Sequence, residues 1–148
     1  MAEKLLNENI VDQIREVFDQ LDKPVEVMFF GSKSDCEYCD DTLQLAGEVV
    51  VISDKLSLKE YDIDTDAELA QQYNVDKVPG LVIAARDGDQ VTDYGVRLAG
   101  IPSGHEFSTL IHDMVLVSSR ESGLSQATRQ ALKELQEPVQ LLVFATPT

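Results

Sequence analysis

Two cysteines, Cys36 and Cys39, are the only thiols in this chain of 148 residues, and they stand three positions apart in the stretch "FFGSKSDCEYCDDTLQLAG". An apolar run precedes them and a helical pattern follows them. At the start of a helix, unpaired N–H groups and the helix dipole favour the thiolate, which is the reactive form of cysteine. The spacing therefore predicts thiol–disulfide exchange, in which Cys36 attacks a substrate and Cys39 resolves the mixed disulfide.

The residues around the cysteines are acidic, and this moderates the predicted reactivity. Only Lys33 is basic nearby. Like-sign charge opposes the formation of a thiolate. We therefore expect the pKa of Cys36 to lie only modestly below the free value of about 8.5, which corresponds to a moderately reducing couple. The surrounding carboxylates are those of Asp35, Glu37, Asp40 and Asp41.

A bare C-x-x-C also occurs in zinc sites and in inert buried pairs. Zinc usually needs four ligands, and a second cysteine pair is missing from the sequence. His105 and His112 lie outside the common ligand spacing, and we interpret them as helix-surface or core-edge side chains. The acidic run "DIDTDAE" lacks the glycine and glutamate spacing of a calcium loop. We predict no metal and no cofactor. Two alternatives stay open: a non-catalytic or redox-sensing interaction module, and a metal or iron–sulfur centre that bridges two chains through Cys36.

The charge balance narrows the classes of partner. Asp and Glu number 27 against 12 Lys and Arg, which gives a net charge of −15. This argues against nucleic acid and anionic membranes, because neutralising phosphate needs basic side chains. The chain has no apolar run of about 18 residues and no signal-peptide core at its charged start, so we expect a cytoplasmic protein. In that compartment paired thiols are more often catalytic, redox-sensing or metal-binding than structural.

The elements that position the thiols follow from the periodicity of apolar residues, which predicts the order α-β-α-β-α-β-β-α. Val78-Pro79 stands directly before one apolar strand, where no ladder donor is needed. Because only about 5% of such bonds are cis, statistics predict a trans bond there. The predicted helices cover about 6–21, 36–50, 67–74 and 101–119, and the strands about 25–30, 57–64, 81–85 and 91–100.

The last part of the chain repeats the first. A helical pattern over 125–137 is followed by "PVQLLVFA", which matches "PVEVMFFG" at 24–31. We interpret this as the beginning of a second copy of the same unit, with chance similarity of two short apolar strands as the alternative. The predicted domains are 1–119, and a linker helix with the first strand of an incomplete unit over 120–148. An apolar strand without its sheet invites pairing, so we expect dimerisation through 138–148.

Together these segments resemble the protein disulfide oxidoreductases of archaea and thermophilic bacteria, which look like two fused glutaredoxin-like units. The resemblance covers nearly the whole chain. It implies an α/β, thioredoxin-like, three-layer fold with a central mixed four-stranded sheet flanked by helices, plus a C-terminal helix and an extra strand. The segment "GIPSGHEF" is the most specific and the C-x-x-C the least; the others are "DIDTDAELAQQYNVDKVPG", "YGVRLAGIPSGHEF" and "LLVFATPT".

The resemblance also implies roles for individual residues. Cys36 is similar to the attacking cysteine and Cys39 to the resolving one. Pro79 matches the position that is cis in this fold and sits against the disulfide. The backbone of Val78 would then pair with a substrate strand. Gly100 corresponds to the glycine that lets the substrate backbone approach closely.

The residues between the cysteines, Glu37 and Tyr38, would tune the reduction potential and contact the partner. The family that this chain resembles reduces, forms and shuffles protein disulfides. Its electrons often come from a flavin-containing thioredoxin-reductase-like enzyme. The matched region stops before a second C-x-x-C, which argues against activities that need two communicating sites, such as isomerisation.

Overall fold

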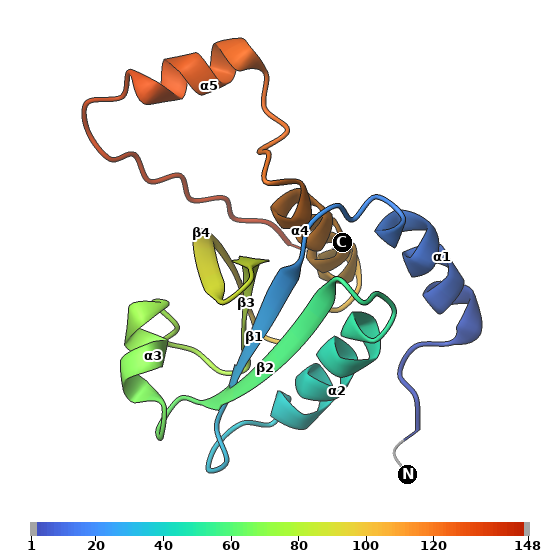
Figure 1. Ribbon diagram of the computed structural model, residues 1–148. Coiled ribbons are helices and arrows are strands. Elements are labelled where there is room, and N and C mark those ends of the chain that lie inside the picture. Colours follow the sequence, from blue (N-terminus) through green and yellow to red (C-terminus); the bar gives the residue numbers. More distant parts are fainter. Residues whose placement is uncertain (1–2, 147–148) are drawn as a thin grey trace.

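The elements follow the predicted order along residues 3–146, the part of the chain that this computed structural model describes (Figure 1). The mixed α/β pattern is confirmed, and a fifth helix lies within the segment predicted over 125–137. The helices are α1 (Glu8–Phe18), α2 (Cys39–Val50), α3 (Ala67–Gln72), α4 (His105–Ser119) and α5 (Gln126–Lys133); the strands are β1 (Val25–Gly31), β2 (Leu56–Asp62), β3 (Gly80–Asp87) and β4 (Gln90–Ala99).

One four-stranded sheet, in the order β2-β1-β3-β4, forms the centre of the fold. β1 runs parallel to β2 and antiparallel to β3, and β3 runs antiparallel to β4, so the predicted mixed sheet is confirmed. In this register Phe30 lies opposite both Tyr61 and Gly80, and Gly80 lies opposite Ala99. The ends of β1, β2 and β4 and the start of β3 therefore meet at one edge of the sheet.

Helices cover both faces of the sheet. β1 is buried along its whole length because its alternating side chains enter two different cores. Val27 and Phe29 face the core beneath α1, α2 and α4, whereas Met28 and Phe30 face the smaller core beneath α3. Figure 1 shows α3 on the opposite side of the sheet from the other helices of this unit. This arrangement confirms the predicted three layers.

A buried carboxylate marks the end of β1 that is remote from the cysteines. Glu26 is only 1% exposed, and its side chain is paired with Arg86 at 2.6 Å and Lys59 at 3.3 Å. Burying a charge is costly unless it is paired. The two cations therefore allow this strand to carry a carboxylate where its neighbours are apolar.

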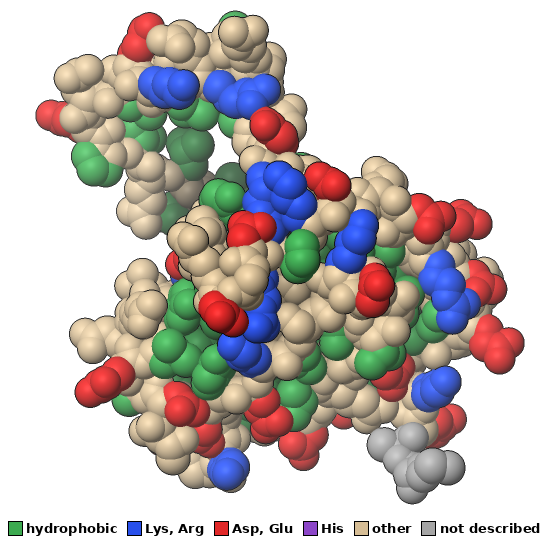
Figure 2. Space-filling view, viewed as in Figure 1, with side chains coloured by type: hydrophobic (Ala, Val, Ile, Leu, Met, Phe, Trp, Pro, Cys, Tyr) green, Lys and Arg blue, Asp and Glu red, His purple; other side chains and the backbone are tan. Residues whose placement is uncertain are grey.

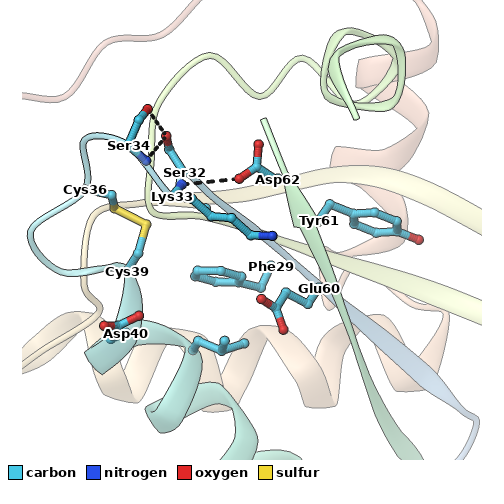
Figure 3. A pocket seen from close by; sticks show the side chains of 12 residues that line it. Phe29, Ser32, Lys33, Ser34, Cys36, Cys39, Asp40, Glu60, Tyr61 and Asp62 are labelled. Carbon is cyan, nitrogen blue, oxygen red and sulfur yellow. Dashed lines mark hydrogen bonds between the residues drawn. A yellow bond between two sulfur atoms is a disulfide. The ribbon is translucent and has the colours of Figure 1, made fainter. Parts of the chain in front are cut away.

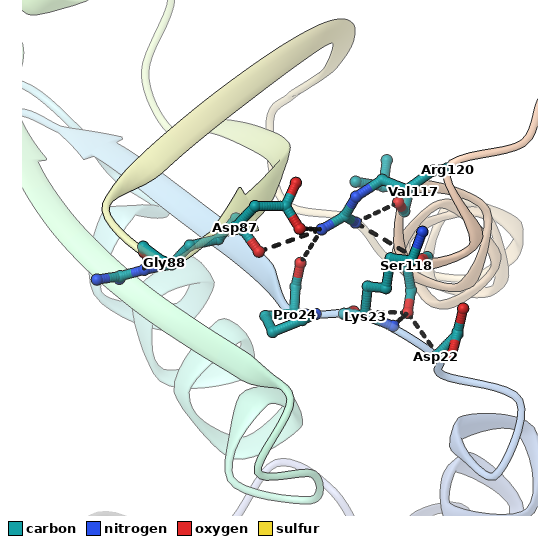
Figure 4. Close-up of polar contacts among 9 residues, drawn as sticks. Asp22, Lys23, Pro24, Asp87, Gly88, Val117, Ser118 and Arg120 are labelled. Carbon is teal, nitrogen blue, oxygen red and sulfur yellow. Dashed lines mark hydrogen bonds and ion pairs between the residues drawn. The ribbon is translucent and has the colours of Figure 1, made fainter.

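Two side chains at the end of α4 tie that helix to the start of β1 (Figure 4). Ser118 Oγ accepts the N–H groups of Asp22 at 2.8 Å and Lys23 at 3.0 Å, and donates to the Lys23 carbonyl at 2.7 Å. Arg120, whose φ is 61°, ends the helix and donates to the Pro24 carbonyl at 2.9 Å. These contacts fix the position of the helical layer against the sheet.

The N-terminal segment is anchored to α2 by one carboxylate. Glu48 accepts the N–H of Leu5 at 3.0 Å and that of Leu6 at 2.9 Å. Desolvation acts to raise the pKa of Glu48, but hydrogen bonds from Gln44, Leu5 and Leu6 together outweigh it and lower the pKa. Leu6 is buried in the main core, so these hydrogen bonds hold the segment before α1 against α2.

The prediction of a strand at 138–148 is wrong for residues 138–146, the part of this segment that the structure describes. Residues 138–146 form no strand, and residues 147–148 lie outside the described residues. A strand needs a hydrogen-bonded neighbour, and the sheet contains only β1 to β4 among the described residues. All side chains from 121 to 146 are exposed, and this arm extends away from the sheet with α5 at its far end (Figure 1). The division at 119/120 stays a prediction.

Candidate dithiol site

Cys36 and Cys39 form a disulfide at the edge of the sheet where β1 ends, with their Cα atoms 5.4 Å apart. α2 begins at Cys39, three residues later than predicted. Tyr38, at the N-cap, has non-helical dihedral angles (φ −109°, ψ 13°), so Cys36 lies in the turn that leads into the helix. The local sequence offers no side-chain cap that would have marked this start.

The two sulfurs differ in accessibility. Cys39 is 7% exposed and belongs to the main core, whereas Cys36 is half-buried and packs against that core from outside. A Cβ added to Gly31 would lie 3.2 Å from Cys39 Sγ and 2.7 Å from the Phe29 ring. The absence of a side chain at Gly31 thus makes room for the inner sulfur. Sequence reasoning missed this residue, although a glycine at the end of a strand signals close packing.

The start of α2 presents unpaired donors beside the disulfide. The Tyr38 carbonyl accepts both the N–H and the hydroxyl of Thr42, at 3.0 and 2.7 Å, and so begins the helical ladder. The N–H groups of Cys39, Asp40 and Asp41 have no acceptor among the described residues. These donors lie where the sequence predicted a partial positive charge near the thiols.

A cleft of about 410 Å³ opens beside the disulfide (Figure 3). Its charged residues come from three elements: Lys33 from the loop after β1, Asp40 from α2, and Glu60 and Asp62 from β2. The parallel pairing of β1 with β2 brings the last two to this edge. Sequence reasoning missed both, because they are more than 20 positions from the cysteines and no local signal connects them. The remaining lining residues are Phe29, Gly31, Ser32, Ser34, Cys36, Cys39, Leu43 and Tyr61.

Asp62 organises the loop that carries Cys36. Its carboxylate accepts the N–H groups of Thr65 at 3.2 Å, Asp64 at 3.0 Å and Lys33 at 3.2 Å. Hydrogen bonds from Thr65 and Asp64 lower the pKa of Asp62 below its usual value, so the group stays charged at neutral pH. The contact with Lys33 joins the loop after β1 to the end of β2.

Three further predicted site residues lie at the same edge of the sheet. The Val78-Pro79 bond is cis, so the trans expectation from statistics is wrong and the one from the resemblance is confirmed. Pro79 directly precedes β3, and its carbonyl accepts the N–H of Gly100 at 2.8 Å. Gly100 has a φ of 88°, which favours glycine. The main-chain N–H and C=O of Val78 have no partner within residues 3–146.

The cleft does not include every predicted residue. Five predicted site residues do not line the cleft within the described part of the chain: Glu37, Tyr38, Val78, Pro79 and Gly100. Glu37 and Tyr38 are exposed in the turn between the cysteines, where the Tyr38 side chain is 48% accessible. Val78 packs against the same core as the cysteines. The structure therefore gathers the predicted residues at one edge but in two places, around the cleft and around the Val78–Gly100 corner.

Residues 3–146 contain no cluster of three or more His, Cys, Asp or Glu side chains that could hold a metal ion. His105 and His112 both lie on α4 and are exposed, as the helix-surface interpretation predicted. Within the same described residues, no helix is long and apolar enough to span a bilayer.

The sheet order, the helical layers and the disulfide at the start of α2 define a thioredoxin-like fold with a redox dithiol. The chain matches no family model. It is similar to the crystal structure of a protein disulfide oxidoreductase from Aeropyrum pernix, with 32% identity, a TM-score of 0.75, and coverage of 91% of this chain and 56% of that one. The predicted resemblance to that class is confirmed. A second neighbour is the alkyl hydroperoxide reductase AhpF of Enterococcus faecalis, with 25% identity, a TM-score of 0.77, and coverage of 88% and 61%.

Curated relatives by sequence are alkyl hydroperoxide reductases of the same AhpF type. The protein from Pseudomonas aeruginosa is 26% identical over 134 residues, which is 89% of this chain and 22% of that protein. The protein from Staphylococcus aureus strain Mu50 is 26% identical over 144 residues, which is 97% of this chain and 25% of that protein. The chain thus spans a quarter or less of these relatives.

Proposed function

We propose that this chain is a protein thiol–disulfide oxidoreductase that exchanges disulfides with protein substrates through Cys36 and Cys39. The observation that carries the proposal is the position of this pair. It lies at the start of α2, at the sheet edge where the cis Pro79 directly precedes β3, in a fold shared with a protein disulfide oxidoreductase. We also propose a cytoplasmic setting, where paired thiols are more often catalytic or redox-sensing than structural.

The exposures of the two sulfurs support a division of roles. In the reductive direction, the accessible Cys36 thiolate attacks a substrate disulfide, and the substrate S–S bond breaks to release one thiol. The buried Cys39 sulfur then attacks Cys36 Sγ and releases the second substrate thiol. Two electrons and two protons pass to the substrate, and the Cys36–Cys39 disulfide remains. The oxidative direction is the reverse of these steps.

Substrate binding is proposed for the corner beside the dithiol. The unpaired N–H and C=O of Val78 can accept a substrate strand by β-augmentation. Pro79 directly precedes β3, and Gly100 has no Cβ to obstruct an approaching backbone. The exposed Glu37 and Tyr38 provide a polar and an aromatic contact to the partner.

We propose a flavin-containing thioredoxin-reductase-like enzyme as the electron donor. The reductase names of the curated relatives support the reductive direction. A homodimer through 138–148 is proposed as well. Its support is the exposure of the apolar arm, in which Leu141 is 86%, Val143 90% and Phe144 91% accessible.

The first test is the dithiothreitol-driven reduction of insulin. We expect activity from the wild-type chain and none above background from Cys36→Ser or Cys36→Ala. Circular dichroism of each variant shows whether the fold is retained. Inactivity of the folded wild-type chain would favour a non-catalytic interaction module.

A trapping experiment assigns the roles of the two sulfurs. Reduced Cys39→Ser protein should accumulate a mixed disulfide with the substrate, because it lacks the resolving thiol. Cys36→Ser should accumulate little, and the double variant serves as the blank. Mass spectrometry under non-reducing conditions identifies the linked cysteine. Trapping by Cys36→Ser instead of Cys39→Ser would reverse the assignment.

A further inference from the structure

The cleft beside the disulfide carries an excess of negative charge. Three carboxylates, those of Asp40, Glu60 and Asp62, line it together with one cation, Lys33 (Figure 3). None of these three carboxylates forms an ion pair with a lysine or arginine within residues 3–146. The cleft therefore keeps a net negative charge, because Lys33 offsets only one of the three carboxylates.

The turn around Cys36 adds to this charge. Asp35, Glu37 and Asp41 are exposed beside the cysteines and make no ion pair in the described part of the chain. Elsewhere, acidic side chains are spread over the visible face, with most of the basic ones grouped over its middle and on the arm (Figure 2). The turn that carries Cys36 is therefore surrounded by carboxylates, in addition to the general negative field of the protein.

We infer that this carboxylate-lined cleft makes the dithiol selective for disulfides carried by positively charged partners and disfavours anionic disulfides. The inference rests on the proposed dithiol exchange and names its substrate class. The partner that it describes is a protein segment in which lysine or arginine flanks the disulfide.

Two physical effects act in the same direction. Clefts lined by charge of one sign raise the local concentration of oppositely charged molecules, and their association becomes faster. The exchange reaction also places negative charge on the departing sulfur, close to the carboxylates. A cation on the substrate offsets that repulsion, whereas an anion increases it. Both effects weaken as salt screens the exposed charges.

The test compares three small disulfides of different charge as oxidants of the reduced protein: cystamine, a dication; 2-hydroxyethyl disulfide, which is neutral; and 3,3′-dithiodipropionate, a dianion. Each reaction consumes the two protein thiols and one disulfide, and yields the Cys36–Cys39 disulfide and two small thiols. Each rate is divided by the rate of 2-mercaptoethanol with the same disulfide, which removes differences in intrinsic reactivity. We expect a normalised cation-to-anion ratio above about tenfold at low ionic strength. The ratio should fall toward one in about 0.5 M salt.

Two double variants separate the cleft from the net charge. Asp40→Asn/Glu60→Gln removes two carboxylates from the lining, and Asp62 is kept because it holds the loop. Glu16→Gln/Glu134→Gln changes the net charge equally, at exposed positions outside the cleft. The first variant should lower the ratio by at least about threefold, and the second should leave it unchanged.

The outcomes distinguish the inference from the proposed function. A wild-type ratio near one, with ready reaction of the neutral disulfide, overturns the selectivity and leaves the dithiol exchange intact. An equal loss in both double variants also overturns it, since net charge would then be the cause. If none of the three disulfides reacts, the proposed function fails, and the inference fails with it.

Discussion

Gly31→Ala is the change for which the structure makes the sharpest prediction. The new Cβ would lie 2.7 and 2.8 Å from two atoms of the Phe29 ring and 3.2 Å from Cys39 Sγ. Favourable carbon contacts lie at about 3.5–4.0 Å, so all three neighbours would have to move. Phe29 is 3% exposed and Cys39 7% exposed, which leaves little space for such movement. We expect the free energy of unfolding to fall by about 1–3 kcal/mol, as is typical of overpacked cores.

The substitution should also affect the dithiol. In the oxidised chain the bond to Cys36 holds Cys39 Sγ in place, whereas the reduced side chain is free to turn. We therefore expect Gly31→Ala to destabilise the oxidised form more than the reduced form. By the thermodynamic cycle, its disulfide is then easier to reduce. Equilibration with dithiothreitol measures this shift, and every 30 mV corresponds to about 1.4 kcal/mol for a two-electron couple.

Urea unfolding of both redox forms is the assay for stability, with Gly47→Ala as the matched control. Gly47 lies inside α2, and a Cβ there would meet nothing within 4 Å. Because glycine is unfavourable in a helix interior, this control should stabilise the chain by about 0.5–1 kcal/mol. The same substitution is thus expected to change stability in opposite directions at Gly31 and Gly47. A Gly31→Ala chain as stable as wild type would refute the packing argument.

Three further predictions concern the frame and the arm. Desolvation opposes a lower pKa of Glu48, but hydrogen bonds from Gln44 and two main-chain amides produce it. The resulting stability is present above the unfolded pKa and is lost as the pH falls through the lower folded pKa. Protection factors of the amides in the N-terminal segment, corrected for the intrinsic exchange rate, should fall in that range, and Glu48→Gln should remove the dependence. Ser118→Ala removes the partner of two part-buried N–H groups and one carbonyl and should cost about 1–3 kcal/mol in thermal unfolding, whereas Ser108→Ala on the exposed side of α4 should change stability by less than about 0.5 kcal/mol. A chain ending at Glu137 should be monomeric by light scattering; if it keeps the oligomeric state of the full chain, the proposed dimer through the arm is wrong.

Much of the fold follows from local patterns. The run "VEVMFF" predicts a strand buried on both faces, and β1 is one. The alternation and turn signals around Asp87-Gly88 likewise predict the hairpin of β3 and β4. These predictions succeed because side-chain periodicity decides which backbone conformation can bury apolar surface.

The wrong structural predictions have a different origin. The segment at 138–146 has strand composition, but strand formation needs a partner, and composition cannot provide one. The predicted start of α2 is wrong because Tyr38 stands at the N-cap without a capping side chain. In neither case do the preferences of the residues involved reveal the outcome.

The sequence alone determined that two thiols stand close enough to form a small disulfide ring before a helix, because a spacing of three positions is a local property. The sequence also contains the segments that resemble the disulfide oxidoreductases, and this resemblance implied that Pro79 is cis. The sequence predicted Cys36 as the attacking sulfur, but only the tertiary structure showed how Cys39 is buried, because that burial depends on Gly31 and the core around it. The tertiary structure also decided the charge of the cleft, because Glu60 and Asp62 reach the cysteines only through the pairing of β1 with β2. Contacts between residues far apart in the chain arise from packing, and no local pattern contains them.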